Sequence, residues 1–232
     1  MKLVLGIIVN AIAIIIGGLI GTFIRGGLKE KYKETVMNGI GLTVIIIGIT
    51  GAIKSENMIL VIISVVLGSI IGEAIGIEAR LDRVGNSLEK RFGQGNSNFS
   101  KGFVTASLVY CVGAMAIVGS LESGLLGNND TLFAKSVLDG ISSIVFASTL
   151  GAGVIFSAIP VFVYQGAIML SASMLKDLLI SEIILEMSAV GGILIMGIGV
   201  NILGINEIKV GNMTPGIFIP LMYFFLISFF GM

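Results

Sequence analysis

Long apolar runs alternate with short polar stretches along the whole chain. Runs such as VIIIGITGAI at 44–53 and LVIISVVLGSII at 60–71 carry no charge and show no regular alternation of apolar and polar positions. A transmembrane strand would alternate over about ten residues, whereas a helix needs roughly 20 apolar residues to cross a hydrocarbon core of about 30 Å. The pattern therefore predicts an all-α integral membrane protein.

We expect about seven or eight membrane segments in a single transmembrane domain, 1–232. The stretch 137–173 is too long for one ordinary helix, and GAG at 151–153 divides it, because glycine permits the tight turn that such a division needs. A polar linker is expected at 78–101, most clearly in DRVGNSLEKRFGQGNSNFSK at 82–101. The expected segments cover 3–24, 36–53, 58–77, 102–121, 137–150, 153–173, 187–204 and 216–231.

Composition agrees with a membrane protein and argues against an enzyme. Hydrophobic residues make up 55% of the chain and charged residues 12%, with a mean hydropathy of +1.06. The chain has one cysteine, Cys111, and no histidine, which excludes the usual zinc sites and Ser-His or Cys-His catalysis. It also lacks a GxxxxGK[ST] motif. We therefore expect no enzymatic activity, no cofactor and no metal.

The basic residues predict how the chain is oriented. They gather after the first and third segments, where short cytoplasmic loops usually carry the excess of Lys and Arg, whereas the opposite loops hold only Lys54 and Lys135. We expect the N-terminus to lie outside and the first segment to be retained in the mature protein. Determining topology is a simpler role for these residues than binding nucleic acid, and we expect no nucleic-acid partner. The two basic groups are Arg25, Lys29, Lys31 and Lys33, and Arg80, Arg83, Lys90, Arg91 and Lys101.

Three short matches in the same order indicate an internal repeat of three helices, 3–77 and 153–231, with intervening helices at 102–150. GIIVNAI at 6–12 matches GVIFSAI at 153–159 with an offset of 147. Gly41 and Gly48 match Gly192 and Gly199 with an offset of 151, and NM at 57–58 matches NM at 212–213. If 102–121 and 137–150 both cross the membrane, the second copy is inverted, as we expect. If 137–150 is only re-entrant, the copies are parallel.

The chain resembles a bacterial inner-membrane family known as Domain of Unknown Function 554. The resemblance rests on IVNAIAIIIGGLIG near the N-terminus, LDGISSIVFASTLGAGVIFSAIPVFVYQGAI in the middle and AVGGILIMGIGVNILGI near the end. It covers most of the chain and implies a polytopic bacterial membrane protein. It implies no particular substrate or mechanism.

Polar residues inside apolar segments indicate a binding site. Each needs a partner in hydrocarbon, and a proline there frees a backbone carbonyl that can bind a cation. The alternative is that the hydroxyls bond to their own helix, the proline only kinks it, and the glutamine joins two helices. For Asp139 a helix N-cap is an equally good interpretation, and Glu73 is equally ambiguous. The candidate substrate-binding residues are Asn10, Asp139, Ser142, Ser143, Ser157, Pro160, Tyr164 and Gln165.

The glycines are better explained by packing than by ligand binding. Gly17 and Gly21 are four residues apart, as are Gly68, Gly72 and Gly76, so each set lies on one helix face and lets a neighbouring helix approach closely.

These features favour a secondary transporter of a small solute or ion, because the repeat, the Gly and Pro interruptions and the polar cluster occur together. Two alternatives remain open: an oligomeric ion channel, and a membrane scaffold in which the polar residues only join helices. The expected partners are the lipid bilayer, a small solute or ion, and further copies of the chain in a homo-oligomer.

Overall fold

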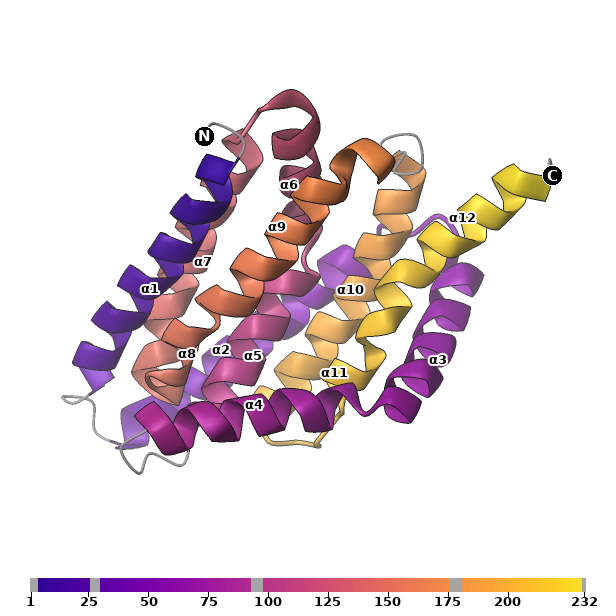
Figure 1. Ribbon diagram of the computed structural model, residues 1–232. Helices are drawn as coiled ribbons and strands as arrows, with labels where there is room; N and C mark the ends of the chain where they lie inside the picture. Colours follow the sequence, from indigo (N-terminus) through magenta and orange to yellow (C-terminus); the bar gives the residue numbers. More distant parts are fainter. Residues whose placement is uncertain (1–3, 26–29, 93–97, 176–180, 231–232) are drawn as a thin grey trace. The chain divides into compact units, whose positions relative to one another are not determined.

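The computed structural model describes residues 4–25, 30–92, 98–175 and 181–230, and every regular element in these ranges is helical (Figure 1). Seven of the described helices are long and apolar enough to cross a membrane, or eight if the bent pair α5 and α6 forms one span. The predicted all-α membrane fold is confirmed. The elements are α1 Leu5–Arg25, α2 Glu30–Ala52, α3 Met58–Ile75, α4 Ile77–Phe92, α5 Phe99–Val112, α6 Ala114–Leu126, α7 Asp130–Leu150, α8 Gly153–Phe156, α9 Ala158–Leu175, α10 Ser181–Ile202, α11 Val210–Met213, η2 Thr214–Phe218 and α12 Ile219–Phe230.

The chain forms two compact units. The first comprises 1–38, 80–111 and 115–173, and the second comprises 39–79, 112–114 and 174–232. The first unit therefore contains α1, most of α4, and α5 to α9. The second contains most of α2, then α3, α10, α11, η2 and α12.

In the first unit, α1 and α7 run parallel and in close contact. Gly6 lies against Leu132, Gly17 against the carbonyl of Gly140, and Gly21 against the carbonyl of Ile144. A side chain at Gly17 or Gly21 would collide with the neighbouring backbone, so both glycines have the packing role that their spacing predicts.

Helix α7 is longer than expected. It begins at Asp130 and has 21 residues, about 31 Å at a rise of 1.5 Å per residue, which is enough to cross the membrane. It ends as predicted at the GAG sequence, where Gly151 adopts a φ of 94° and its N–H donates to the Ala147 carbonyl. The length of α7 removes the main reason for treating 137–150 as a re-entrant segment.

The single helix expected at 102–121 is instead a broken one, because α5 and α6 meet near Gly113 at an angle of 58°. Gly102 of α5 lies against Leu150, at the end of α7, and Gly119 of α6 lies against Leu132, near its start. The two pieces together run antiparallel to most of the length of α7, as one broken span would.

The expected linker at 78–101 begins with an amphipathic helix, α4, which runs across the ends of α5 and α8 (Figure 1). Ring contacts hold the end of α4: the centroids of Phe92 and Phe156 are 5.0 Å apart, and Phe99 lies 5.3 Å from Phe156. Its basic side chains Arg80, Arg83, Lys90 and Arg91 are all exposed. An apolar stripe below an exposed basic face is typical of a helix lying in the membrane interface.

In the second unit, α2 and α10 pack antiparallel through paired glycines. A Cβ atom at Gly48 would lie 2.6 Å from the Gly192 carbonyl oxygen, and one at Gly41 would lie 3.3 Å from the Gly199 carbonyl oxygen. Such contacts allow backbones to approach closely, which is how helices associate in lipid.

Helix α3 packs against α11 and η2 through Gly72 and Gly68, which lie against the backbone of Asn212 and Gly216. Gly76 does not belong to this packing face, contrary to its spacing. It caps α3 in the left-handed conformation, with a φ of 71°, and no heavy atom lies near its missing side chain.

The carboxylate of Glu186, on α10, fixes the start of α3. It accepts hydrogen bonds from the Ser55 hydroxyl at 2.6 Å and from the backbone N–H groups of Glu56 and Asn57 at 2.9 and 3.0 Å. At the other end of α3, Glu73 is exposed and forms an ion pair with Lys209 at 2.7 Å. Both carboxylates therefore have structural partners.

Candidate functional site

A buried ion pair lies inside α7. Lys135 and Asp139 are one helical turn apart, so their side chains share a face, and each residue is only 5 or 6% exposed. The Lys135 ammonium lies 2.9 and 2.7 Å from the two Asp139 carboxylate oxygens. Asp139 is nine residues inside its helix and is therefore no N-cap, a position that Asn129 occupies.

Lys135 is a functional candidate that the sequence interpretation placed in a loop. The segment was expected to begin at 137, so Lys135 was counted among the residues that set topology. The missed signal was its spacing: Lys135 and Asp139 stand at i and i+4, which on one helix allows an ion pair and makes a buried charge tolerable.

Helix α5 supplies Tyr110 to the same place. The ring centroid lies 5.8 Å from the Lys135 ammonium, a cation–π distance, and the phenol hydroxyl lies 2.9 Å from the Ser143 hydroxyl. Ser142 is within 3.5 Å of the same phenol and donates a shorter bond, 2.7 Å, to the Leu138 carbonyl of its own helix. Tyr110 is another residue that the sequence interpretation did not select.

Two amide side chains from α1 and α9 meet beside the ion pair. The Asn10 side-chain nitrogen donates to the Gln165 side-chain oxygen at 3.3 Å, and both residues are fully buried. The Asn10 amide also lies close to the Asp139 carboxylate. This contact joins Asn10, Asp139 and Gln165, three of the predicted site residues, in one cluster.

The amide pair is only half satisfied. The Asn10 side-chain oxygen and the Gln165 side-chain nitrogen are buried without a hydrogen-bond partner, and so is the Tyr164 hydroxyl. An unpaired buried polar atom costs about 1–3 kcal/mol, so each of these atoms would be stabilised by a hydrogen bond to a further polar group. Here an acceptor, a donor and a hydroxyl occur in the same unit as the ion pair.

The structure does not bring Ser157 and Pro160 to this cluster. The Ser157 hydroxyl donates to the Val154 carbonyl at 2.7 Å, and Ser157 precedes Gln165 by eight residues, about 12 Å along the helix axis. Pro160 is the third residue of α9, in the first turn, where a missing N–H is tolerated. The helix break is at Ser157, between α8 and α9, and the proline does not interrupt a continuous helix.

The cluster comprises Asn10, Tyr110, Lys135, Asp139, Ser143 and Gln165, and we call it the polar cluster. Tyr164 precedes Gln165 in α9. The polar cluster offers one carboxylate, one ammonium, two amides and hydroxyl groups, with no net charge. Among the described residues, no three His, Cys, Asp or Glu side chains lie close enough to hold a metal ion. These groups are chemically suited to bind a small polar molecule or ion reversibly.

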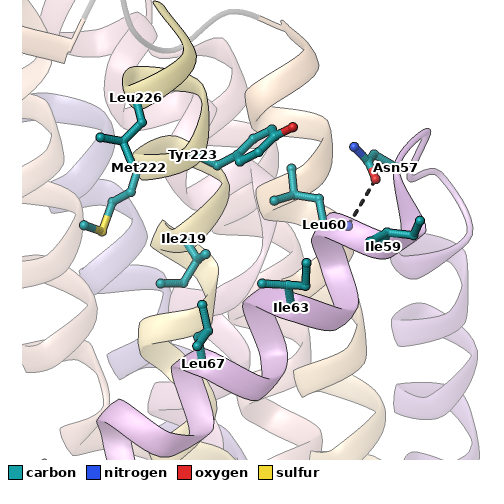
Figure 2. A pocket seen from close by; sticks show the side chains of 9 residues that line it. All are labelled: Asn57, Ile59, Leu60, Ile63, Leu67, Ile219, Met222, Tyr223 and Leu226. Atoms are coloured by element: carbon teal, nitrogen blue, oxygen red, sulfur yellow. Dashed lines mark hydrogen bonds between the residues drawn. The ribbon is translucent and has the colours of Figure 1, made fainter. Parts of the chain in front are cut away.

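The second unit contains a pocket of a different kind, between α3 and α12 (Figure 2). Its volume is about 320 Å³, and its lining is apolar apart from Asn57 and Tyr223. The Asn57 side-chain oxygen already accepts the Leu60 N–H at 3.1 Å as the cap of α3. This pocket has little with which to recognise a charged solute. Its lining residues are Asn57, Ile59, Leu60, Ile63, Leu67, Ile219, Met222, Tyr223 and Leu226.

Comparison with known proteins agrees with the fold. A family model described as "Protein of unknown function (DUF554)" matches residues 5–225. The chain belongs to this family. The resemblance inferred from the three sequence stretches is thus confirmed. Helices α1, α5, α7 and α9, which carry the polar cluster, all lie within the matched residues.

Two similar proteins come from two different bacteria. The chain is 35% identical over 195 residues to "Uncharacterized membrane protein YdfK" of Bacillus subtilis (strain 168), covering 82% of each chain. It is 27% identical over 199 residues to "Uncharacterized protein YqgA" of Escherichia coli (strain K12), covering 84% of this chain and 85% of the other. No solved structure matches the chain. The family and the helices together identify a multi-pass membrane protein.

Proposed function

We propose that this protein is a secondary transporter of a small solute or ion, and that the polar cluster is its binding site. The observation that carries the proposal is the combination of a buried ion pair with unpaired amide atoms inside helices long and apolar enough to cross the membrane. Ionisable residues within such helices are costly, and they usually mark the path of a substrate or ion.

The helix contacts of the first unit support an inverted duplication. Asn10 of α1 contacts Gln165 of α9. Gly18, further along α1, lies against Ile155 of α8, which comes earlier in the chain than Gln165. Helix α1 and the α8–α9 segment therefore run antiparallel. With the offset of 147, Gly18 corresponds to Gln165 and Asn10 to Ser157. Exchanging the two copies therefore turns the contact of Asn10 with Gln165 into one of Ser157 with Gly18. The observed contact of Gly18 is with Ile155, two residues away from Ser157.

The second unit supports the same interpretation with an offset of 151. Gly41 lies near Gly199 and Gly48 near Gly192, while the repeat pairs Gly41 with Gly192 and Gly48 with Gly199. Exchanging the copies therefore turns the contact of Gly41 with Gly199 into that of Gly48 with Gly192. A two-fold axis perpendicular to two antiparallel helices relates contacts in this way. Inverted repeats with broken helices are common in secondary transporters. The basic α4 and the charge asymmetry support an orientation with the N-terminus outside in a bacterial inner membrane.

A scaffold is the second candidate, because many buried hydroxyls are satisfied within their own helices. Ser107, Ser120 and Ser136 each donate to the carbonyl four residues earlier at 2.6–2.7 Å. In a scaffold, the Asn10–Gln165 bond would serve only to join two helices.

A thermal-shift screen of purified protein separates these candidates. Wild type is screened with alkali-metal chlorides, amino acids, carboxylates and sugars, and so are Gln165→Ala and, as a matched control, Ser157→Ala, which removes a satisfied hydroxyl from the same chain segment. A binding site predicts that some ligand stabilises wild type and Ser157→Ala but not Gln165→Ala, while the melting point without ligand changes little.

A scaffold predicts the reverse: Gln165→Ala melts at a lower temperature without any ligand, and no compound stabilises wild type. Uptake of the stabilising compound into proteoliposomes then tests transport itself. A stabilising compound that Gln165→Ala still binds undiminished would place the binding site elsewhere.

A further inference from the structure

The ion pair in α7 restricts the charge of any ligand that binds beside it. Lys135 and Asp139 together carry no net charge, and their side chains are only 6 and 8% exposed. A ligand with a net charge would leave an unbalanced charge in this buried place, which is expensive. A ligand with one positive and one negative group adds no net charge, and it offers each member of the pair a new counter-ion.

Such an exchange of partners needs no movement of the α7 backbone. Lys135 and Asp139 are one turn apart, a spacing at which Cβ atoms are about 5–6 Å from each other. The Lys135 ammonium stands on a flexible four-carbon stem, so it can turn from Asp139 to a carboxylate of the ligand, while Asp139 accepts the ammonium group of the ligand. Two groups on adjacent turns require ligand charges that lie close together. An α-amino acid meets this requirement, because a single carbon carries both of its charges.

The amide pair beside the ion pair adds one free acceptor and one free donor. The Asn10 side-chain nitrogen donates to the Gln165 side-chain oxygen, and the Asn10 amide also lies close to the Asp139 carboxylate. These contacts leave the Asn10 oxygen and the Gln165 nitrogen without a partner. An ammonium group can donate to the first of these atoms, and a carboxylate can accept from the second.

Stability alone does not account for the two charges. Replacing a buried ion pair by apolar side chains of similar volume is often neutral or stabilising, so α7 does not need the pair in order to fold. An uncharged solute can satisfy the free amide atoms, but it makes no use of the charges of Lys135 and Asp139. A ligand with both charges uses all four groups.

We propose that the polar cluster binds a small α-amino acid as its zwitterion, with the ligand carboxylate on Lys135 and the ligand ammonium on Asp139. Asn10 and Gln165 supply the further acceptor and donor. The inference rests on the proposed transport function and names its substrate class. Because these four residues are at most 6% exposed, the helices must separate locally to admit the ligand, as alternating access requires.

The test is a thermal-shift titration of the purified full-length protein with glycine, L-alanine and L-serine. Ethylamine and propionate are the controls that carry only one of the two charges, and acetamide is the uncharged control. An amino acid should raise the melting temperature, and each control should bind at least about tenfold more weakly, because a hydrogen bond to a charged group contributes about a factor of ten or more to affinity. Equal stabilisation by any control, or no stabilisation by the three amino acids, would overturn the proposal.

Variants locate the site. The double variant Lys135→Met with Asp139→Leu removes both charges without leaving either one unpaired, and it should bind L-alanine about 100-fold or more weakly than wild type. Gln165→Ala should bind it about tenfold more weakly, and this variant decides if the double variant does not fold. Lys209→Met, which breaks the exposed pair with Glu73, is the matched control and should bind L-alanine like wild type. Undiminished binding by the double variant or by Gln165→Ala would refute the assignment.

Proteoliposomes separate this inference from the proposed function. Counterflow of radiolabelled L-alanine is expected for wild type and should be lost in the double variant. Uptake of a different solute, lost in Gln165→Ala and without any binding of amino acids, would leave the transporter standing and overturn the substrate class. Binding of L-alanine that depends on Gln165 but leads to no uptake would leave the amino-acid site standing and overturn the transport function.

Discussion

The buried ion pair should contribute little net stability yet be costly to break. Replacing Lys135 by Met leaves a buried carboxylate without its partner, and replacing Asp139 by Leu leaves a buried ammonium. The double variant, Lys135→Met with Asp139→Leu, removes both charges and keeps similar side-chain volumes. The three variants together measure how strongly the two side chains are coupled.

The expected magnitude follows from the geometry. The N–O distances are 2.7 and 2.9 Å, and opposite unit charges at such a separation attract by about 6 kcal/mol at an effective dielectric constant of about 20. Desolvation of the two groups offsets most of this attraction. Each single variant should therefore lower the free energy of unfolding by about 3–5 kcal/mol, whereas the double variant should be close to wild type.

Reversible denaturation in mixed micelles, followed by far-UV circular dichroism, measures these free energies. The exposed pair of Lys209 and Glu73 is the control, because its side chains are 63 and 59% exposed and solvent screens their attraction. Lys209→Met should leave the unfolding transition almost unchanged. A double variant of the buried pair that is as unstable as the two single variants added together would refute the reasoning.

Two further predictions concern packing and topology. Gly48→Ala should destabilise the protein, because the added methyl group meets the backbone of α10. Gly39→Ala should be neutral or slightly stabilising, because no heavy atom lies within 4 Å of the added methyl group. Thermal melting of both variants checks this, and equal melting temperatures would contradict the close glycine packing of α2 on α10. In a Cys111→Ser background, a cysteine at Asn128 should react with an impermeant thiol reagent in intact cells and one at Arg91 should not; the reverse pattern would refute the proposed orientation.

Hydropathy predicted the helices well because the solvent constrains them. In hydrocarbon, every backbone polar group must be bonded within the segment, so a run of about 20 apolar residues has few alternatives to a helix. The expected segments 3–24 and 58–77 thus differ from α1 and α3 by no more than two residues at either end. The end of α7 at GAG could also be predicted from the sequence, because glycine adopts the positive φ seen at Gly151 without help from distant residues.

Hydropathy failed where burial by neighbouring helices outweighs the cost of a polar residue. Lys135 lowers the local hydropathy, which moved the expected start of α7 to 137, yet a carboxylate one turn away and an aromatic ring on α5 stabilise its charge. The phenol of Tyr110 is likewise satisfied by Ser143, 33 residues away. Such contacts between distant residues are not a property of any local window, so the site could be predicted only in part.

The amphipathic α4 was missed for a related reason. Its stretch has low hydrophobicity, and a scale that averages over a window hides the spacing of Leu81, Val84, Leu88 and Phe92, which places them on one face of a helix. Periodicity was the relevant signal there.

If the proposed duplication is correct, the two copies differ in chemistry where the polar cluster lies. The contact of Asn10 with Gln165 is polar and adjoins Asp139, whereas its counterpart brings Gly18 against the apolar Ile155. Two-fold symmetry would otherwise produce two equivalent sites. The asymmetry arises because α7, which belongs to neither copy, supplies the ion pair and packs parallel to α1, along the face that carries Gly6, Gly17 and Gly21. A duplicated bundle can therefore keep symmetric glycine packing for its helix contacts and still hold one chemically distinct site, set by a helix outside the repeat.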